Sequence, residues 1–255
     1  MATALGNNSY IGLGAEGTYG TTVDRTLFEL HNRESRKPTE VKVESPSVYR
    51  RSRDIRRRER GRVDMGGDFS FMGRYSSRFF TTLLQHVFGS GSSSSSQPDV
   101  TAAPTVYRHT FTPQDTLPTG LSLEVAKDVL SHLHSGCKVA SLGMQFAQNE
   151  LMEVTANIIG RETTSIARTP LVYTDGQIVV ANNVTWSWNG VNQNVISGDL
   201  TIENPLTRRN FVNSRYTSEP LPNGKRRVTG SFMVEFEDAV IYSDFRNATE
   251  RVMVV

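Results

Sequence analysis

The chain has 255 residues, of which 37% are hydrophobic, and a formal net charge of +2. This length fits one large β domain or two small ones and is sufficient to bury a core. The apolar runs are too short to cross a membrane as a helix, and the first ten residues lack the basic and apolar regions of a secretory signal. The single cysteine, Cys137, excludes an intrachain disulfide.

Positive charge is concentrated in one segment. Residues 33–62 contain twelve Lys/Arg and five Asp/Glu, a local excess of +7, so the other residues together carry −5. Eight arginines fall within the fourteen positions 49–62. A nucleic-acid coat protein is basic overall, whereas this chain combines a basic segment with a mildly acidic body.

The first 62 residues show no amphipathic period. Residues 1–32 are rich in Gly, Asn and Thr, which predicts an extended N-terminal arm with tight turns. Residues 33–62 contain few apolar side chains, and no helix or strand face that would bury well passes through the arginines. We therefore expect an Arg-rich loop over 33–62. Only a partner would order it, because an ordered arginine side chain loses up to about 2 kcal/mol of rotamer entropy.

Residues 63–255 have the patterns of a β core. Apolar residues at Phe79, Leu83 and Val87, four apart, predict a helix near 76–88 that ends at Gly89. The serine run predicts a flexible insertion over 89–98. Strand patterns occur around 61–73, 107–112, 121–126, 138–147, 151–160, 178–190, 194–204 and 226–238, followed by a short helix candidate at 238–250. The expected fold is mainly β, an antiparallel β-sandwich or barrel-type domain with one or two flanking helices.

Four strands share an alternating pattern that sorts their side chains onto two faces. The segments 140–146, 152–158, 184–188 and 196–203 each place apolar residues on one face. The other face carries Ser, Thr, Asn, Gln, Asp and Glu, without Lys or Arg at those positions. Two interpretations remain open. It is the solvated side of an antiparallel sheet, or it is a face along which a polyanion slides without adhering, since solvated faces usually include lysines.

No catalytic, metal-binding or cofactor-binding motif stands out. His132 and His134 lie near Cys137, but no second ligand pair of zinc-site spacing supports a metal centre. The glycines of 12–20 neither follow a predicted strand nor precede a GK[ST] sequence, so they do not form a phosphate loop. We expect no catalytic residue, no metal and no cofactor.

Several motifs resemble one viral family in order along most of the chain. The sequences "YIGLGAEGTYGT" (10–21), "SGCKVASLGMQFAQNELMEVTANIIGRE" (135–162), "GDLTIENPLTRRNFVNSR" (198–215) and "KRRVTGSFMVEFED" (225–238) resemble segments of the tail tube proteins, or major tail proteins, of long-tailed bacteriophages. The Ser-rich insertion and the density of arginines at 50–62 do not correspond to family features.

The resemblance implies a β-sandwich flanked by a helix, as a single tail-tube domain over 1–255. It implies subunits in a ring, usually a hexamer, that stack into a hollow tube through which double-stranded DNA passes without specific binding. Other tail proteins would join the tube ends, without a membrane anchor. The expected location is the virion, after assembly in the host cytoplasm. Some relatives form three-fold rings from duplicated domains, and a weak repeat between 62–71 and 227–236 leaves that alternative open.

The arginines have three alternative roles: contact with another copy, DNA binding, or solvation in a loop. Arginines lining a channel would immobilise DNA, because each neutralised phosphate adds affinity. We therefore predict inter-subunit or inter-ring contact, with bidentate pairing to carboxylates. The predicted contact residues are Arg50, Arg51, Arg53, Arg56, Arg57, Arg58, Arg60 and Arg62. The predicted channel lining is Glu153, Thr155, Asn157, Thr185, Ser187, Ser197, Asp199, Thr201 and Glu203.

The leading hypothesis is a structural protein of the tail tube. Three rivals remain: a nucleic-acid-binding module that uses the arginines, a capsid or tail-completion subunit, and an enzyme without a recognisable catalytic motif.

Overall fold

A computed structural model of the chain describes residues 9–35, 37–44, 58–75, 77–91, 93–102, 106–172, 176–236 and 239–254. The elements, in chain order, are β1 (Tyr10–Ala15), β2 (Leu27–Glu29), β3 (His31–Glu34), β4 (Lys37–Glu44), β5 (Arg58–Met72), α1 (Arg78–Phe88), β6 (Ser93–Ser96), β7 (Arg108–Phe111), β8 (Leu121–Lys127), β9 (Leu130–Ala147), β10 (Glu153–Gly160), β11 (Glu162–Ile166), a 3-10 helix (Ala181–Asn183), β12 (Trp186–Trp188), β13 (Val191–Gln193), β14 (Val195–Glu203), β15 (Leu206–Arg209), β16 (Ser218–Pro222), β17 (Arg227–Val234), α2 (Val240–Arg246) and β18 (Met253–Val254). The predicted mainly β fold with flanking helices is confirmed.

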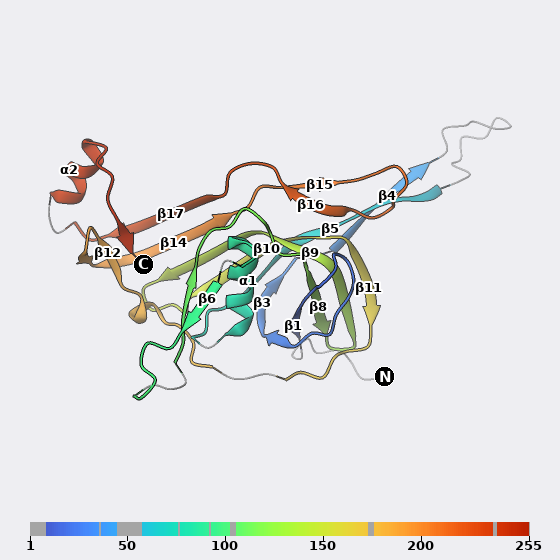
Figure 1. The fold of residues 1–255 in the computed structure, drawn as a ribbon, viewed down its shortest axis with the longest axis horizontal. Coiled ribbons are helices and arrows are strands. Elements are labelled where there is room, and N and C mark those ends of the chain that lie inside the picture. The colour runs from blue at the N-terminus through green and yellow to red at the C-terminus, as the bar shows by residue number, and fades with distance from the viewer. Residues whose placement is uncertain are drawn as a thin grey trace.

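Most strands belong to one antiparallel sheet that β9 divides into two parts (Figure 1). The first half of this 18-residue strand pairs with β8 and β11, and β8 continues the sheet to β1 and β2. The second half pairs with β10 and β14, which continue to β5 and β17. The series of hydrogen-bonded strands begins at β2 and ends at β3 without returning to its start. The described strands therefore form a sandwich-type arrangement and do not close into a barrel.

The hydrophobic core lies between these parts of the sheet and helix α1. Phe79, Leu83 and Val87, the residues spaced four apart, are all buried, which confirms the predicted helix. The Phe79 ring meets Phe71 of β5 edge-on, with ring centroids 5.2 Å apart. The Ser77 hydroxyl accepts a hydrogen bond from the Phe80 N–H and caps the helix start.

The N-terminal segment is a core strand, and the prediction of an arm over 1–32 is wrong for its described part. Strand β1 pairs with both β2 and β8, and Tyr10, Ile11 and Leu13 are buried. Its glycines permit close approach. A Cβ on Gly12 would lie 3.0 Å from the Phe28 ring, and one on Gly14 would lie 2.4 Å from the Asp24 carbonyl oxygen.

The serine run also contains regular structure, so a wholly flexible insertion over 89–98 is a wrong prediction. Ser93–Ser96 form β6, which pairs with β7 in a two-stranded antiparallel sheet. All four serines are exposed. Hydrogen bonding between the backbones of β6 and β7 orders this segment. The residue types of a segment do not reveal such pairing.

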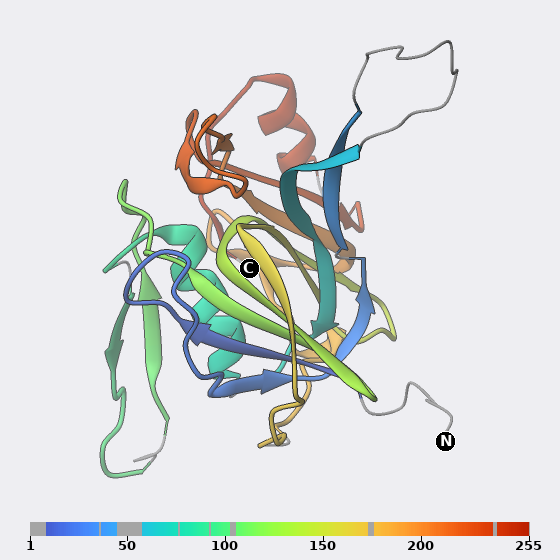
Figure 2. The same cartoon turned by 90° about the vertical axis from the view of Figure 1, so that its right-hand side faces the viewer.

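The Arg-rich segment is a β-hairpin at its base, so the predicted loop over 33–62 is wrong for its described residues. Strand β4 pairs with β5 from Lys37 opposite Gly66 to Glu44 opposite Arg58. At one end of the molecule the two strands extend beyond β15 and β16 (Figure 1), and they run side by side in the second view (Figure 2). This hairpin of β4 with the first half of β5 is here called the arm. Charged side chains of opposite sign stabilise such cross-strand pairs without an apolar face.

Candidate assembly and channel surfaces

Most of the predicted channel-lining residues lie together on one face of the sheet, here called the polar face. The register places them in rows across β10, β9 and β14. These rows are Glu153 with Gln145 and Asp199, Thr155 with Gly143 and Thr201, and Asn157 with Ser141 and Glu203. Ser197, opposite Ala147, continues the same alternation beyond Asp199. The sequence pattern thus correctly identified the side chains that share this face.

The opposite face of the same strands is the core. Val154, Ala156 and Ile158 of β10 and Leu142 of β9 have no exposed surface. The residues between them on β10 are half-buried, and Asp199 and Glu203 on β14 are exposed. Because side chains alternate along a strand, the polar face points away from the hydrophobic core.

The polar face is acidic at its centre and has an arginine towards each margin. Arg227 of β17 lies opposite Glu203, and Arg33 of β3 contacts Asp68 of β5 at 3.5 Å. The hydrogen bond from Ser35 and the nearby Arg33 guanidinium lower the pKa of Asp68. Arg227 and Asp68 also belong to this face, although they lie outside the four segments whose alternation predicted it. The segments 227–234 and 64–72 also alternate, and sorting their side chains onto two faces would have identified both residues.

Two of the predicted lining residues do not lie in these rows. Ser187 belongs to β12, which forms a separate three-stranded sheet with β13 and β18, and Thr185 precedes that strand. Ser187 lies opposite Asn192 and Val254. The expectation that four alternating strands contribute to one polar face is therefore wrong. Three of them do, namely β9, β10 and β14.

The part of the sheet that carries the polar face has exposed residues on both outer strands. Among the described strands, β17 pairs only with β14, while β3 and β4 pair with β5 at the other side. Apolar side chains are exposed on both, such as Val228 and Met233 on β17 and Val43 on β4. An open strand edge presents backbone N–H and C=O groups to which another chain can add.

The arginines at the base of the arm already have acidic partners within it. Arg58 pairs with Glu44 at 2.9 Å, Arg60 approaches Glu40 at 3.8 Å, and Arg62 pairs with Asp64 at 2.7 Å. The other predicted contact residues lie outside the described residues, and they are Arg50, Arg51, Arg53, Arg56 and Arg57. The three described arginines are exposed, and their charge is partly balanced by these intrachain carboxylates.

The loop between β15 and β16 braces the base of the arm. The Nε of Arg215 donates to the Gly61 carbonyl at 3.0 Å, and the same guanidinium pairs with Glu40. Arg208 of β15 donates from Nη2 to the Met65 carbonyl at 2.7 Å. These contacts attach β5 to a segment 143 to 154 residues further along the chain, so the direction of the arm is fixed by the body of the protein.

A sequence model of the family described as phage tail tube protein matches residues 6–254. The chain belongs to the phage tail tube protein family. It is therefore a structural protein of the virion tail, where family members assemble into a tube. A search among curated proteins finds no match. Among the described residues, no helix is long and apolar enough to cross a membrane.

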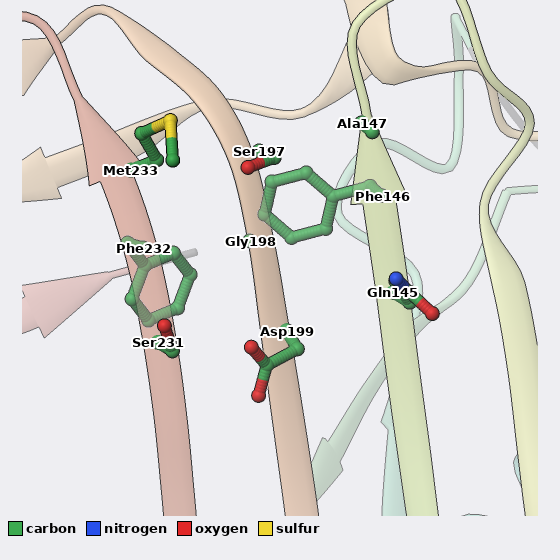
Figure 3. A pocket seen from close by; sticks show the side chains of 9 residues that line it. All are labelled: Gln145, Phe146, Ala147, Ser197, Gly198, Asp199, Ser231, Phe232 and Met233. Carbon is green, nitrogen blue, oxygen red and sulfur yellow. The ribbon is translucent and has the colours of Figure 1, made fainter.

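An aromatic cluster of this tail tube protein closes one end of the sheet. Phe146 of β9 and Phe232 of β17 approach each other across Gly198 of β14, with ring centroids 6.2 Å apart (Figure 3). A Cβ at Gly198 would come within 2.7 Å of both rings. Trp186 of β12 stacks on Phe232 at 5.7 Å and so joins the three-stranded sheet to β17. The small cavity beside Gly198 belongs to this packing arrangement.

His134 and Cys137 take part in ordinary packing of the tail tube protein. Nδ1 of His134 is 2.8 Å from the Thr163 hydroxyl, and Cys137 is buried, with its thiol directed at the His134 carbonyl. In the described part of the chain, no three His, Cys, Asp or Glu side chains are grouped so that they could hold a metal ion.

Proposed function

We propose that copies of this tail tube protein form closed rings that stack into a hollow tube, and that the polar face lines the channel through which DNA is delivered. The observation that carries this proposal is the combination of a sheet face whose central strands, β9, β10 and β14, are acidic or neutral with strands available for pairing at both of its sides. A sheet with this design can be continued by a second copy without covering the polar face.

Ring formation would occur by strand addition. The edge of β17 in one copy would pair with the β3 and β4 side of the next, so that the sheets join into one barrel around the channel. A closed barrel leaves no strand edges exposed. The family resemblance favours six copies, and three is the alternative if the similarity of β5 with α1 and β17 with α2 reflects a duplication.

The charge of the polar face suits the passage of DNA. Glu153, Asp199 and Glu203 repel phosphates, and the neighbouring Ser, Thr and Asn side chains carry no charge. Binding to DNA gains affinity with each phosphate that a protein neutralises, through counterion release. A channel whose central strands are acidic or neutral avoids this gain, and the DNA remains free to move.

The arginines would act between copies. Residues 45–57, which connect β4 to β5 in the sequence, contain five arginines and one aspartate, an excess of +4, and the described part of the arm points away from the body. We propose that these arginines contact carboxylates of the next ring, together with Arg58, Arg60 and Arg62. Single exposed pairs contribute only about 0–1 kcal/mol, but every copy in the ring repeats them.

A nucleic-acid-binding role is the alternative use of the same arginines. The intrachain pairing of Arg58, Arg60 and Arg62 with carboxylates argues against it, because those carboxylates repel phosphate. Filter binding to double-stranded DNA across a salt series separates the two functions. A steep fall of affinity with salt supports DNA binding, and negligible binding at all salt concentrations supports the tube.

Electron microscopy of the purified full-length protein tests the proposed function directly. We expect hollow cylinders with a regular axial repeat, and averaged end views give the ring symmetry. Solitary particles without symmetry over a wide range of protein concentrations contradict the proposal. A reconstruction in which the arginines of residues 50–62 crowd the bore contradicts the assignment of the polar face.

A further inference from the structure

The short helix α2 buries its aspartate and exposes its two aromatic residues. Asp244 is 5% exposed, whereas Tyr242 is 58% and Phe245 84% exposed. Phe236, just before the helix, is 75% exposed. A surface helix of a folded domain normally has the opposite orientation, with its apolar side chains directed at the core.

Specific contacts hold α2 in this orientation. The Asp244 carboxylate accepts two hydrogen bonds from Arg251, one to each oxygen and both at 3.0 Å. The indole N–H of Trp188 donates to the same carboxylate at 3.1 Å. Bidentate pairing with arginine is geometrically specific. Rotating the helix to bury Phe245 would break all three bonds, so the apolar side is fixed outward.

A second exposed apolar feature lies in the loop between β15 and β16. Phe211 is 52% exposed, and Val212 is exposed as fully as a residue in an extended chain. This Phe211–Val212 tip shares a shallow depression with Arg60 and Arg62 at the base of the arm. The arm and α2 lie at opposite ends of the long axis of the molecule (Figure 1).

The two ends also differ in charge. The segment 235–251, which contains α2, has five acidic residues and two arginines, a net charge of −3. The segment 33–62, which contains the arm, carries +7. The stretch of sequence around α2 is thus acidic, and the stretch that contains the arm beside the Phe211–Val212 tip is basic.

We propose that the exposed side of α2 binds the Phe211–Val212 tip of a second copy, so that Arg60 and Arg62 beside that tip face the acidic surroundings of α2. The contact joins different surfaces of identical chains. Such head-to-tail contacts propagate into open assemblies when the two surfaces lie at opposite ends. This inference rests on the proposed stacking of rings and names the surfaces that meet. The aromatic residues of α2 form the centre of the contact and the charged groups its rim.

Substitution of the exposed aromatic residues tests the surface. Tyr242→Ser and Phe245→Ser each remove an exposed side chain, so the fold and ring formation remain unchanged. Truncation of a central aromatic residue commonly weakens an interface by roughly tenfold or more. We expect the protein concentration needed for tube formation to rise accordingly. Tyr107→Ser is the matched control, since Tyr107 is 55% exposed near β7, and it leaves tube formation unchanged.

Disulfide cross-linking identifies the partner residue. The double variant Val212→Cys with Phe245→Cys is assembled under reducing conditions and then oxidised, while the buried Cys137 does not compete. We expect covalent ladders of many copies, and only single chains when either cysteine is present alone. Tubes that form without ladders, or normal tube formation by both serine variants, overturn the inference but leave the proposed function standing. A wild-type chain that forms no tubes contradicts the proposed function itself.

Discussion

The Nε of Arg25 donates to the carboxylate of Glu124 at 2.8 Å in a site where Glu124 has no exposed surface. Thr169 donates to the same carboxylate from its backbone N–H and its hydroxyl. Burial by itself raises the pKa of Glu124, but the hydrogen bonds from Thr169 and Arg25 outweigh it and lower the pKa. This contact attaches the segment after β1 to β8 and therefore stabilises the sheet.

Removing Arg25 leaves the Glu124 carboxylate buried without its cation. We expect Arg25→Ala to lower the free energy of unfolding by about 3 kcal/mol or more, the usual loss when one partner of a buried pair is removed. Urea unfolding measures this loss. The control is Arg33→Ala, which removes an exposed arginine from Asp68 and costs no more than about 1 kcal/mol. Equal losses for the two variants contradict the structural role of the Arg25 pair.

His86 on α1 makes stability depend on pH. Burial and the nearby positive charge of Lys138 lower the pKa of His86 from 6.5 to about 4. The folded state therefore favours the neutral ring, and the stability that this contributes is present above pH 6.5 and is lost as pH falls towards 4. Each pKa unit corresponds to about 1.4 kcal/mol, so the full loss is about 3 kcal/mol.

Unfolding curves between pH 7 and pH 4.5 measure this loss. Wild-type stability should fall over that range, and His86→Gln should show a much flatter dependence because its side chain does not titrate. A variant that retains the wild-type slope indicates that another group is responsible. The exposed His109 provides the control, and His109→Gln should leave the slope unchanged.

Gly198 is required by the aromatic rings on either side of it. We expect Gly198→Ala to destabilise the protein by about 1–3 kcal/mol, as overpacking does in a filled core, because its Cβ would clash with Phe146 and Phe232. Gly143 is the matched control on β9. A Cβ there would meet its nearest neighbour, the Thr201 hydroxyl, at an ordinary 3.5 Å. Thermal unfolding should separate the two variants, and an equally stable Gly198→Ala argues against close packing of the two rings around this glycine.

The sequence predicted those elements whose burial depends on periodic apolar residues. Helix α1 follows from residues spaced by four, and the two faces of β10 follow from strict alternation. On β14 the alternation predicts a core position for Ile196, which is 45% exposed because a bulge follows Val195. A bulge shifts the side chains of one strand by one position relative to its partner. The sequence of that strand alone does not reveal the bulge.

The remaining errors come from contacts between distant segments. The glycines of β1 resemble a turn-rich arm until Phe28 and Asp24 are seen packed against them. The charged strand β4 resembles a loop because its stability comes from pairing with β5 rather than from burial. Ser187 has the correct alternation but belongs to another sheet, and Thr185 precedes that strand, since periodicity identifies the faces of a strand and not its neighbours.

The arginines of the arm are predicted to act in assembly and not in folding. Replacing Arg56, Arg57 and Arg58 with Ser should shorten or abolish the tubes while the circular dichroism spectrum and unfolding midpoint stay close to wild type. The matched variant has lysine at the same three positions. It keeps the charge but loses bidentate pairing, so we expect tubes of intermediate length. If the serine variant forms tubes of normal length, the proposed role of these arginines in assembly is wrong.

The acidic residues of the polar face are predicted to act in DNA passage and not in assembly. The double variant Asp199→Lys with Glu203→Lys should still form tails, because both side chains are exposed. Lysines along the channel would bind phosphates in every ring, and each contact adds affinity through counterion release. We therefore expect slower DNA release from virions that carry the variant, with the delay decreasing as salt is raised. Asp24→Lys with Asp115→Lys changes the net charge equally at exposed positions elsewhere and is the control. Unchanged release by the channel variant, or equal slowing by the control, contradicts the assignment of Asp199 and Glu203 to the channel wall.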